Sequence, residues 1–162
     1  MAVDMYLKLD SVNGESIDDS HAGEIDLLSC RFGATQTGTA HTGGGAGAGR
    51  VQVQDLTLTK RVDRASAVLF SLCCKGEHLA KAQITVRRAG GRSPLEYLKV
   101  HLEKVLITAY STGGTETDEE LTETLSLNFA KMRVEYTPQK LDGSGAPSII
   151  KGWDIGANKV WD

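Results

Sequence analysis

The sequence predicts a mainly β protein: an antiparallel β-barrel of two sheets with one lateral α-helix and an extended Gly-rich loop. Several segments alternate apolar and polar residues with the period of a strand, and only the segment 64–75 has the period of an amphipathic helix. The connections between the strand-like segments are mostly turn-sized, which favours antiparallel pairing. The 162 residues suit one domain, 1–162, with a sizeable core.

The first two strands are expected at 3–9 and 24–32. In the first, apolar residues alternate with polar ones from Val3 to Leu9. The second strand has a face that we expect in the core, with Leu28, Cys30 and Phe32. Its opposite face becomes polar along its length and carries Ile25, Leu27, Ser29 and Arg31.

A run of glycine and alanine follows between Thr42 and Arg50. It consists of Gly43, Gly44, Gly45, Ala46, Gly47, Ala48 and Gly49. These residues bury little apolar surface, and glycine loses much backbone entropy when it is ordered. We therefore expect a protruding loop that becomes ordered against another molecule.

The next strand, 51–62, changes phase between Val53 and Leu56, so a bulge is expected near Gln54 and Asp55. The helix 64–75 follows, with Asp63 as the expected N-cap and Gly76 just past its end. Its predicted buried stripe consists of Ala65, Val68, Leu69, Leu72 and Cys73.

Three further strands and a short closing strand complete the prediction. The strand 82–88 directs Ala82, Ile84 and Val86 inward, and 89–92 is a turn. The long strand 95–109 has one face with Leu98, Val100, Leu102 and Leu106, and another with Lys99, His101 and Glu103. An acidic linker, 111–120, precedes the strand 121–137, which has a second expected bulge near Phe129 and Ala130. In the tail, 152–155 is predicted to dock as a short closing strand.

Composition limits the classes of partner. The net charge of −3 and the absence of a basic stripe argue against nucleic acid or an anionic membrane surface. Three cysteines, two of them adjacent, are a poor disulfide framework and indicate buried thiols in a reducing compartment. The first eight residues lack the features of a signal peptide, so the chain is expected to fold in the cytoplasm.

No catalytic, cofactor or metal motif emerges, so we predict that the protein is not an enzyme and needs no cofactor. The segment 44–50 differs from a phosphate-binding loop, because Arg50 and Val51 stand where lysine and serine or threonine are required. The four histidines lack the spacing of metal ligands, and no Gly-x-Ser-x-Gly motif occurs.

Short motifs along nearly the whole chain nevertheless resemble one family. They include the segments 1–9, 13–16 and 24–28 with His21, the glycine run followed by 53–60, the segments 82–91, 96–98, 111–114, 127–130 and 136–139, and Gly152-Trp153. Together they are similar to the haemolysin co-regulated protein (Hcp) family, in its single-domain form without a C-terminal toxin extension.

The resemblance implies a structural subunit of the type VI secretion system. Proteins of this family form hexameric rings that stack into an inner tube, inside a contractile sheath and below a spike protein. Sheath contraction expels the tube, and the ring lumen carries and protects effector proteins. The resemblance thus implies a protein that assembles in the cytoplasm and leaves through this system without a signal peptide or membrane insertion.

Two site hypotheses follow. We expect the loop of Thr42, Gly43, Gly44, Gly45, Ala46, Gly47, Ala48 and Gly49 to connect stacked rings, because it is long and lies between two strands. Ser29 and Arg31 are expected to line the lumen and contact cargo, although the face with Lys99, His101 and Glu103 fits equally well. A phage tail-tube-like protein and a small-ligand-binding β-barrel are the alternative functions, and the sequence identifies neither the effector nor the target cell.

Overall fold

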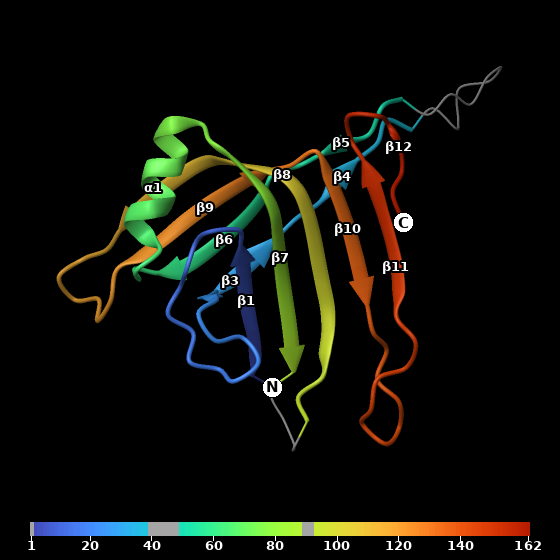
Figure 1. Cartoon of the computed structure of the whole chain (residues 1–162), viewed down its shortest axis with the longest axis horizontal. Coiled ribbons are helices and arrows are strands. Elements are labelled where there is room, and N and C mark those ends of the chain that lie inside the picture. Colours follow the sequence, from blue (N-terminus) through green and yellow to red (C-terminus); the bar gives the residue numbers. More distant parts are fainter. Residues whose placement is uncertain (1, 39–48, 89–92) are drawn as a thin grey trace.

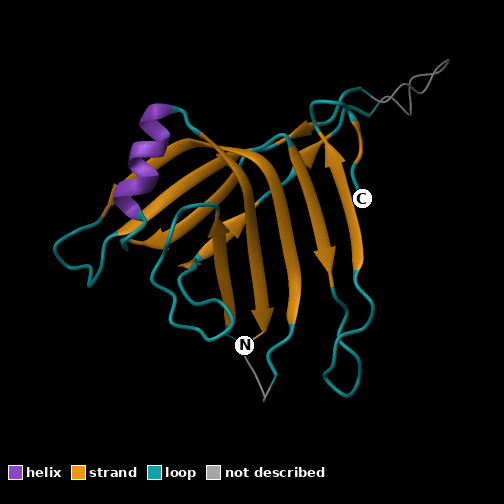
Figure 2. Ribbon diagram, in the orientation of Figure 1, coloured by secondary structure: helices purple, strands orange, loops and turns teal. Residues whose placement is uncertain are grey.

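The computed structural model describes residues 2–38, 49–88 and 93–162, and it shows a mainly β fold with one helix (Figures 1 and 2). In chain order, the elements are β1 (Val3–Leu9), β2 (Ile25–Asp26), β3 (Ser29–Arg31), β4 (Ala34–Thr35), β5 (Gln52–Val53), β6 (Leu56–Arg61), α1 (Ser66–Lys75), β7 (His78–Arg88), β8 (Glu96–Gly113), β9 (Thr122–Asn128), β10 (Lys131–Tyr136), β11 (Ile149–Asp154) and β12 (Lys159–Val160). The predicted mainly β class, with two antiparallel sheets and one lateral helix, is confirmed, but the described strands do not close into a barrel.

The long strand β8 organises the larger sheet. Its first half pairs with β10 and its second half pairs with β9, while β7 lies along its other side. From β10 the sheet continues to β11 and β12, and from β7 it continues to β1 and β2. From β9 it continues to β6 and β3, whereas β4 and β5 form a separate small sheet.

The predicted second strand is two short strands, because the chain crosses between the two halves of the sheet at Leu27 and Leu28. The Leu27 N–H donates to the Met5 carbonyl at 2.9 Å, and the Leu28 N–H donates to the Thr59 carbonyl at 2.8 Å. On one side of this crossing β2 pairs with β1, and on the other side β3 pairs with β6. A crossing segment, rather than one continuous pair of strands, thus joins the two halves.

This crossing also changes which face is buried, and it corrects one prediction. Ile25 and Leu27 are buried, whereas Leu28 and Phe32 are exposed, so the placement of Leu28 and Phe32 in the core is wrong. Cys30 packs against the core as expected. A strict period of two fails here because the segment does not remain in one pair of strands.

Both predicted bulge positions are places where the strand changes partner. Gln54 and Asp55 separate β5, which pairs with β4, from β6, which pairs with β3 and β9. Phe129 and Ala130 separate β9 from β10, which both pair with β8, while the partner on the other side changes from β6 to β11. The positions are confirmed, but each is a break between two strands rather than a bulge within one.

A further phase change within β8 overturns the prediction for Leu106. Leu102 is buried on the expected face, but Val105 and Ile107 are buried beyond it, and Leu106 is not. Lys104 lies between the two parts with a φ of 53°, a left-handed conformation that side chains other than glycine rarely adopt. This residue reverses the faces where β8 passes from one half of the sheet to the other.

Helix α1 lies against the second half of β8 and closes one side of the core. It begins at Ser66 with Ala65 at the N-cap, so the prediction of Asp63 as the N-cap is wrong. Asp63 lies two residues earlier, and its Oδ1 accepts from the Ala65 N–H at 2.9 Å. Gly76, with a φ of 63°, ends the helix as predicted. Leu69 is buried, but Val68 is 44% exposed and does not belong to the buried stripe.

The C-terminal strands extend the sheet beyond the core instead of closing it. Six consecutive residues of β11 pair with β10, and β12 pairs with the end of β11. The segment 152–155 therefore belongs to a strand, as predicted, but this strand lies near the open edge (Figure 1). In the described parts of the chain, no helix has the length and apolar character that crossing a membrane requires.

Candidate functional site

A face rich in hydroxyl groups covers the side of β3, β6, β9 and the end of β8 that points away from the core. One row across the four strands consists of Ser29, Thr59, Thr124 and Ser111. The neighbouring row consists of Arg31, Thr57, Ser126 and Ala109. We call these two rows the hydroxyl face. It places Ser29 and Arg31, the predicted lumen residues, side by side on one exposed surface.

The hydroxyl face is almost uncharged, and Arg31 is its one cation. Ser29 Oγ and Thr59 Oγ1 lie 2.5 Å apart, so these two hydroxyls are hydrogen-bonded to each other. Arg31 is exposed and makes no ion pair with the residues that the structure describes. The surface is therefore wet and polar, with a single guanidinium free to reach a carboxylate.

The alternative lumen face on β8 is different in character. Lys99 pairs with Glu96 at 2.9 Å, His101 contacts Glu135 at 3.0 Å, and Glu103 lies 3.7 Å from Lys131. Each of its three predicted residues thus already has an oppositely charged or hydrogen-bonding partner on its own or the next strand. The geometry consequently distinguishes two faces that the sequence left equivalent.

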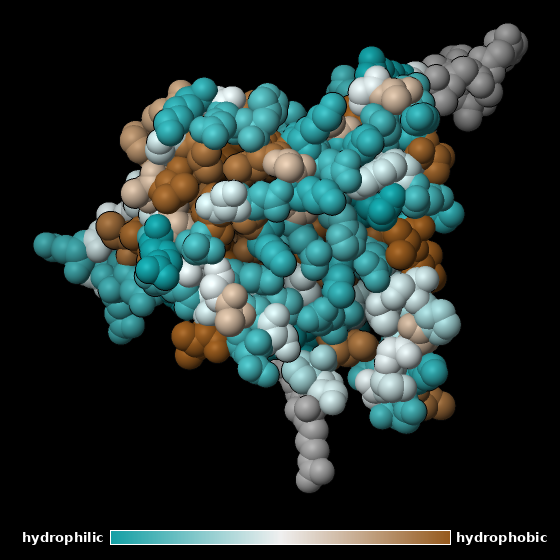
Figure 3. Space-filling view, viewed as in Figure 1, coloured by the Kyte–Doolittle hydropathy of each residue, from teal (hydrophilic) through white to brown (hydrophobic). Residues whose placement is uncertain are grey.

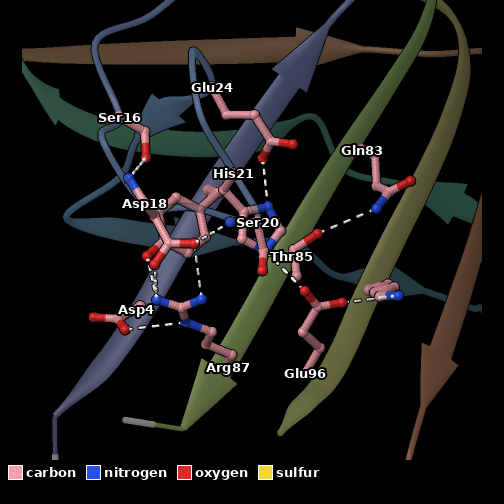
Figure 4. A network of polar contacts seen from close by, with 12 residues as sticks. Asp4, Ser16, Asp18, Ser20, His21, Glu24, Gln83, Thr85, Arg87 and Glu96 are labelled. Atoms are coloured by element: carbon pink, nitrogen blue, oxygen red, sulfur yellow. Dashed lines mark hydrogen bonds and ion pairs between the residues drawn. The ribbon is translucent and has the colours of Figure 1, made fainter. Parts of the chain in front are cut away.

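A polar cluster that the sequence did not reveal fastens the loop 10–24 onto β1, β7 and β8 (Figure 4). His21 is 6% exposed, and its ring stacks on Tyr6 at 4.3 Å between centroids. His21 Nδ1 lies 2.9 Å from Glu24 Oε2, and Nε2 lies 2.8 Å from Glu96 Oε1. We call this arrangement the loop clasp, together with the adjacent Arg87.

Arg87 forms the second half of the loop clasp. Its guanidinium donates to both carboxylate oxygens of Asp18, to Asp4 at 3.2 Å and to the Tyr6 hydroxyl at 2.9 Å. The hydrogen bond from Arg87 lowers the pKa of Asp18 and raises that of Arg87 itself. Burial raises the pKa of Glu96, but hydrogen bonds from Lys99 and His21 outweigh it and lower the pKa overall.

The loop clasp has the residue types of an acid–base site but not the arrangement of one. Both ring nitrogens of His21 face carboxylates, so neither is left to accept a proton from a hydroxyl or thiol nucleophile. The thiol of Cys30 is no better suited, because burial raises its pKa to about 11. The described residues also contain no group of three or more His, Cys, Asp or Glu side chains that could hold a metal ion.

A second buried polar cluster fastens α1 to the sheet. Lys60 is fully buried, and its Nζ lies 2.9 Å from Glu123 Oε2 and 2.8 Å from Asp63 Oδ1. The Tyr110 hydroxyl donates to the other oxygen of Glu123 at 2.9 Å, and Ser66 contributes a further hydroxyl. We call this the buried ion pair.

Known proteins share the fold and much of the sequence of this chain. The family model described as "Type VI secretion system effector, Hcp" matches residues 6–136. The chain is 46% identical over 159 residues to protein hcp1 of Pseudomonas aeruginosa, covering 98% of each chain. This chain belongs to the Hcp family. Among solved structures, Hcp1 from Salmonella typhimurium is 36% identical with a TM-score of 0.82, covering 99% of this chain and all of that one. A "type six secretion system protein" is 29% identical with a TM-score of 0.93 and the same coverage.

Family membership, a mainly β tube-protein fold and a place in type VI secretion are thus established for this Hcp chain. Residues 42–48 of the predicted ring-stacking loop lie outside the described residues, and only Gly49 lies within them. The acidic group Asp118, Glu119 and Glu120 lies in an exposed connection between β8 and β9, as predicted. Alternation alone could not reveal the loop clasp or the buried ion pair, because their charged residues occupy ordinary strand positions.

Proposed function

We propose that this Hcp-family chain is the inner-tube subunit of a type VI secretion system and acts by self-association rather than by catalysis. Six copies form a ring, rings stack into a tube, and sheath contraction drives the tube out with effector proteins in its lumen. The sheath and spike proteins are its partners, and one domain, 1–162, suffices for the subunit. The chain assembles in the cytoplasm before it is secreted.

The hydroxyl face is the observation that carries this proposal. A channel through which different folded proteins pass needs a wall that stays wetted and binds none of them tightly. Hydroxyl rows across four strands supply such a wall, because a hydroxyl donates and accepts yet carries no charge. The face on β8 is already paired within itself, so it suits an outer surface better.

Assembly is tested first. Purified protein is examined by size-exclusion chromatography with light scattering and by electron microscopy. We expect a mass of roughly six copies of the 17.4 kDa chain and annular particles, since a closed ring saturates every interface. A chain that remains monomeric at high concentration contradicts the proposal.

The lumen assignment is tested by reversing charge on one face at a time. Arg31→Glu replaces the one cation of the hydroxyl face and is expected to change which effectors co-purify with the rings. Glu103→Lys is the matched control on the alternative face and is expected to leave the set of effectors unchanged. The opposite result, with cargo sensitive to residue 103 and not to residue 31, assigns the lumen to the β8 face.

A further inference from the structure

An apolar groove of about 540 Å³ opens on the flank away from α1. The small sheet of β4 and β5 forms one wall with the segment before it, and β10 and β11 form the other. Its apolar lining consists of Phe32, Ala34, Val51, Val53, Met132, Val134, Trp153 and Ile155. The groove exists because the two walls run beyond the core and stay apart.

An isolated chain leaves this groove unfavourably exposed. Removing apolar surface from water stabilises a protein by about 25 cal/mol for each Å², so an open groove with an apolar lining favours an apolar occupant. The Trp153 indole N–H is also buried without an acceptor among the described residues, which makes this wall costly in the free chain. Val53, Met132 and Ile155 pack against the core from one side and line the groove from the other, so the groove continues the apolar interior out to the surface.

The opposite flank carries apolar side chains that protrude. Phe70 on α1 is 55% exposed, and Val68, two residues earlier and so on a different side of the helix, is 44% exposed. Val62 and Leu121, whose backbones are bonded to each other near the start of the helix, are also nearly half exposed. Figure 3 shows apolar surface on this flank and, separately, on the flank formed by β11.

The charges of the two flanks are complementary. The connection that precedes Leu121 contains Glu116, Asp118, Glu119 and Glu120, all exposed. At the groove, Lys151 contributes to the lining, and its side chain is 77% exposed although it also pairs with Asp162 at 2.9 Å. Arg50 lies close by and donates to the Ile155 carbonyl at 2.9 Å. Complementary charges of this kind favour one orientation of approach.

We propose that the groove receives the α1 flank of a second copy of this chain, with Phe70 as the apolar anchor and the acidic connection beside Lys151. This inference rests on the proposed function, because a ring requires two different surfaces on each subunit, joined head to tail. Contact between a groove on one flank and a ridge on the other satisfies that requirement. A self-complementary contact would end at a dimer.

The experiment uses two variants that each damage one surface. Ala34→Glu places a carboxylate in the groove, facing the acidic flank, and Phe70→Asp removes the anchor. Both positions are exposed, so the chains are expected to fold, which circular dichroism checks. Each variant alone is expected to lose rings in light scattering. An equimolar mixture is expected to form dimers of one copy of each, because one intact groove can still receive one intact flank. Ile17→Asp, at a residue 99% exposed on the loop 10–24, is the control and should form rings.

The possible results are distinguishable. Wild-type protein that stays monomeric contradicts the proposed function itself. Wild-type rings that persist in both variants leave the proposed function standing and overturn the groove as the interface. Loss of rings in both variants without dimers in the mixture overturns the head-to-tail contact between these two surfaces. If either variant fails to fold, a second pair of variants exchanges the charges of the two surfaces. Lys151→Glu alone should weaken the rings, and the double variant with Glu119→Lys should restore them.

Discussion

Single residues of the loop clasp decide whether the loop 10–24 stays on the sheet. His21 bridges a carboxylate of its own loop, Glu24, and one at the start of β8, Glu96. It also covers one side of the Tyr6 ring, while the Arg87 guanidinium lies 5.1 Å from the ring centroid. Gly14 allows the loop to fold back, because a Cβ there would collide with the Glu24 carbonyl. The aromatic ring is thus held between two cationic or hydrogen-bonding groups.

Replacing His21 by leucine is expected to lower the free energy of unfolding by about 1–3 kcal/mol, since it removes the partner of Glu24 and one of the two partners of Glu96. Urea denaturation followed by circular dichroism measures the change. His78→Leu, at an exposed histidine on β7, is the matched control and should stay within about 0.5 kcal/mol of the wild type. Equal losses of unfolding free energy in the two variants would show that the loop clasp does not stabilise the fold.

The lowered pKa of Glu96 predicts how the free energy of unfolding depends on pH. Its folded pKa is below the ordinary value, so the unfolded chain binds more protons as the pH falls. The stabilisation is fully present above the unfolded pKa, about 4.3, and is lost as the pH falls through the lower folded pKa. Glu96→Gln should therefore lower stability at pH 7 and flatten its decline below about pH 5. The free energy of unfolding is measured by urea denaturation at each pH. Parallel curves of this free energy against pH for the variant and the wild type would contradict the role of Glu96.

At the scale of elements, the buried ion pair connects β6, β9 and the turn before α1. Lys60 and Glu123 occupy facing positions of β6 and β9, and Asp63 brings the start of the helix to the same ammonium group. A buried pair adds little net stability, but removal of one partner leaves an uncompensated charge. Its main consequence is that β6, β9 and α1 have one favourable mutual placement.

Glu123→Ala is therefore expected to destabilise the fold, but by less than a fully broken buried pair costs, about 3–5 kcal/mol, because Asp63 keeps its contact with Lys60. The double variant Lys60→Met with Glu123→Leu should recover part of that loss, because it removes the two fully buried charges and fills the space, while Asp63 still accepts from the Ala65 N–H. Glu120→Gln is the matched control, since the Arg61–Glu120 pair joins the same region but is more than half exposed. Guanidinium denaturation of the four proteins compares them, and a double variant no better than Glu123→Ala would contradict the argument.

Periodicity predicts an element only where the spacing of the apolar residues changes clearly. The strand 3–9, the end of α1 at Gly76 and the breaks at residues 54–55 and 129–130 produce clear changes of pattern. The crossing at Leu27 and Leu28 does not, because apolar residues occupy both phases there. Thr85 and Arg87 occupy the polar phase of β7, yet both are buried, because the loop 10–24 covers the outer face. Contacts distant in sequence therefore determined the parts that alternation missed.

At the scale of the whole molecule, three surfaces point in different directions. The hydroxyl face covers one half of the sheet, the apolar groove opens beside β11, and the α1 flank lies opposite the groove (Figure 1). A ring subunit needs all three: a wall for the lumen and two unlike sides for its neighbours. It also needs a contact along the tube axis, and the sequence places the glycine run between two strands for that role.

Shortening residues 42–49 to a two-residue turn is expected to leave rings intact but to abolish stacked tubes. The physical reason is that the run has almost no side chains of its own, so its contribution to assembly must come from reach and from backbone contacts with the next ring. Light scattering reports the rings, and electron microscopy reports the tubes. A same-length replacement by glycine and serine is the control and should retain tubes, because it preserves reach and flexibility. Tubes of normal length from the shortened chain would show that rings stack through other surfaces.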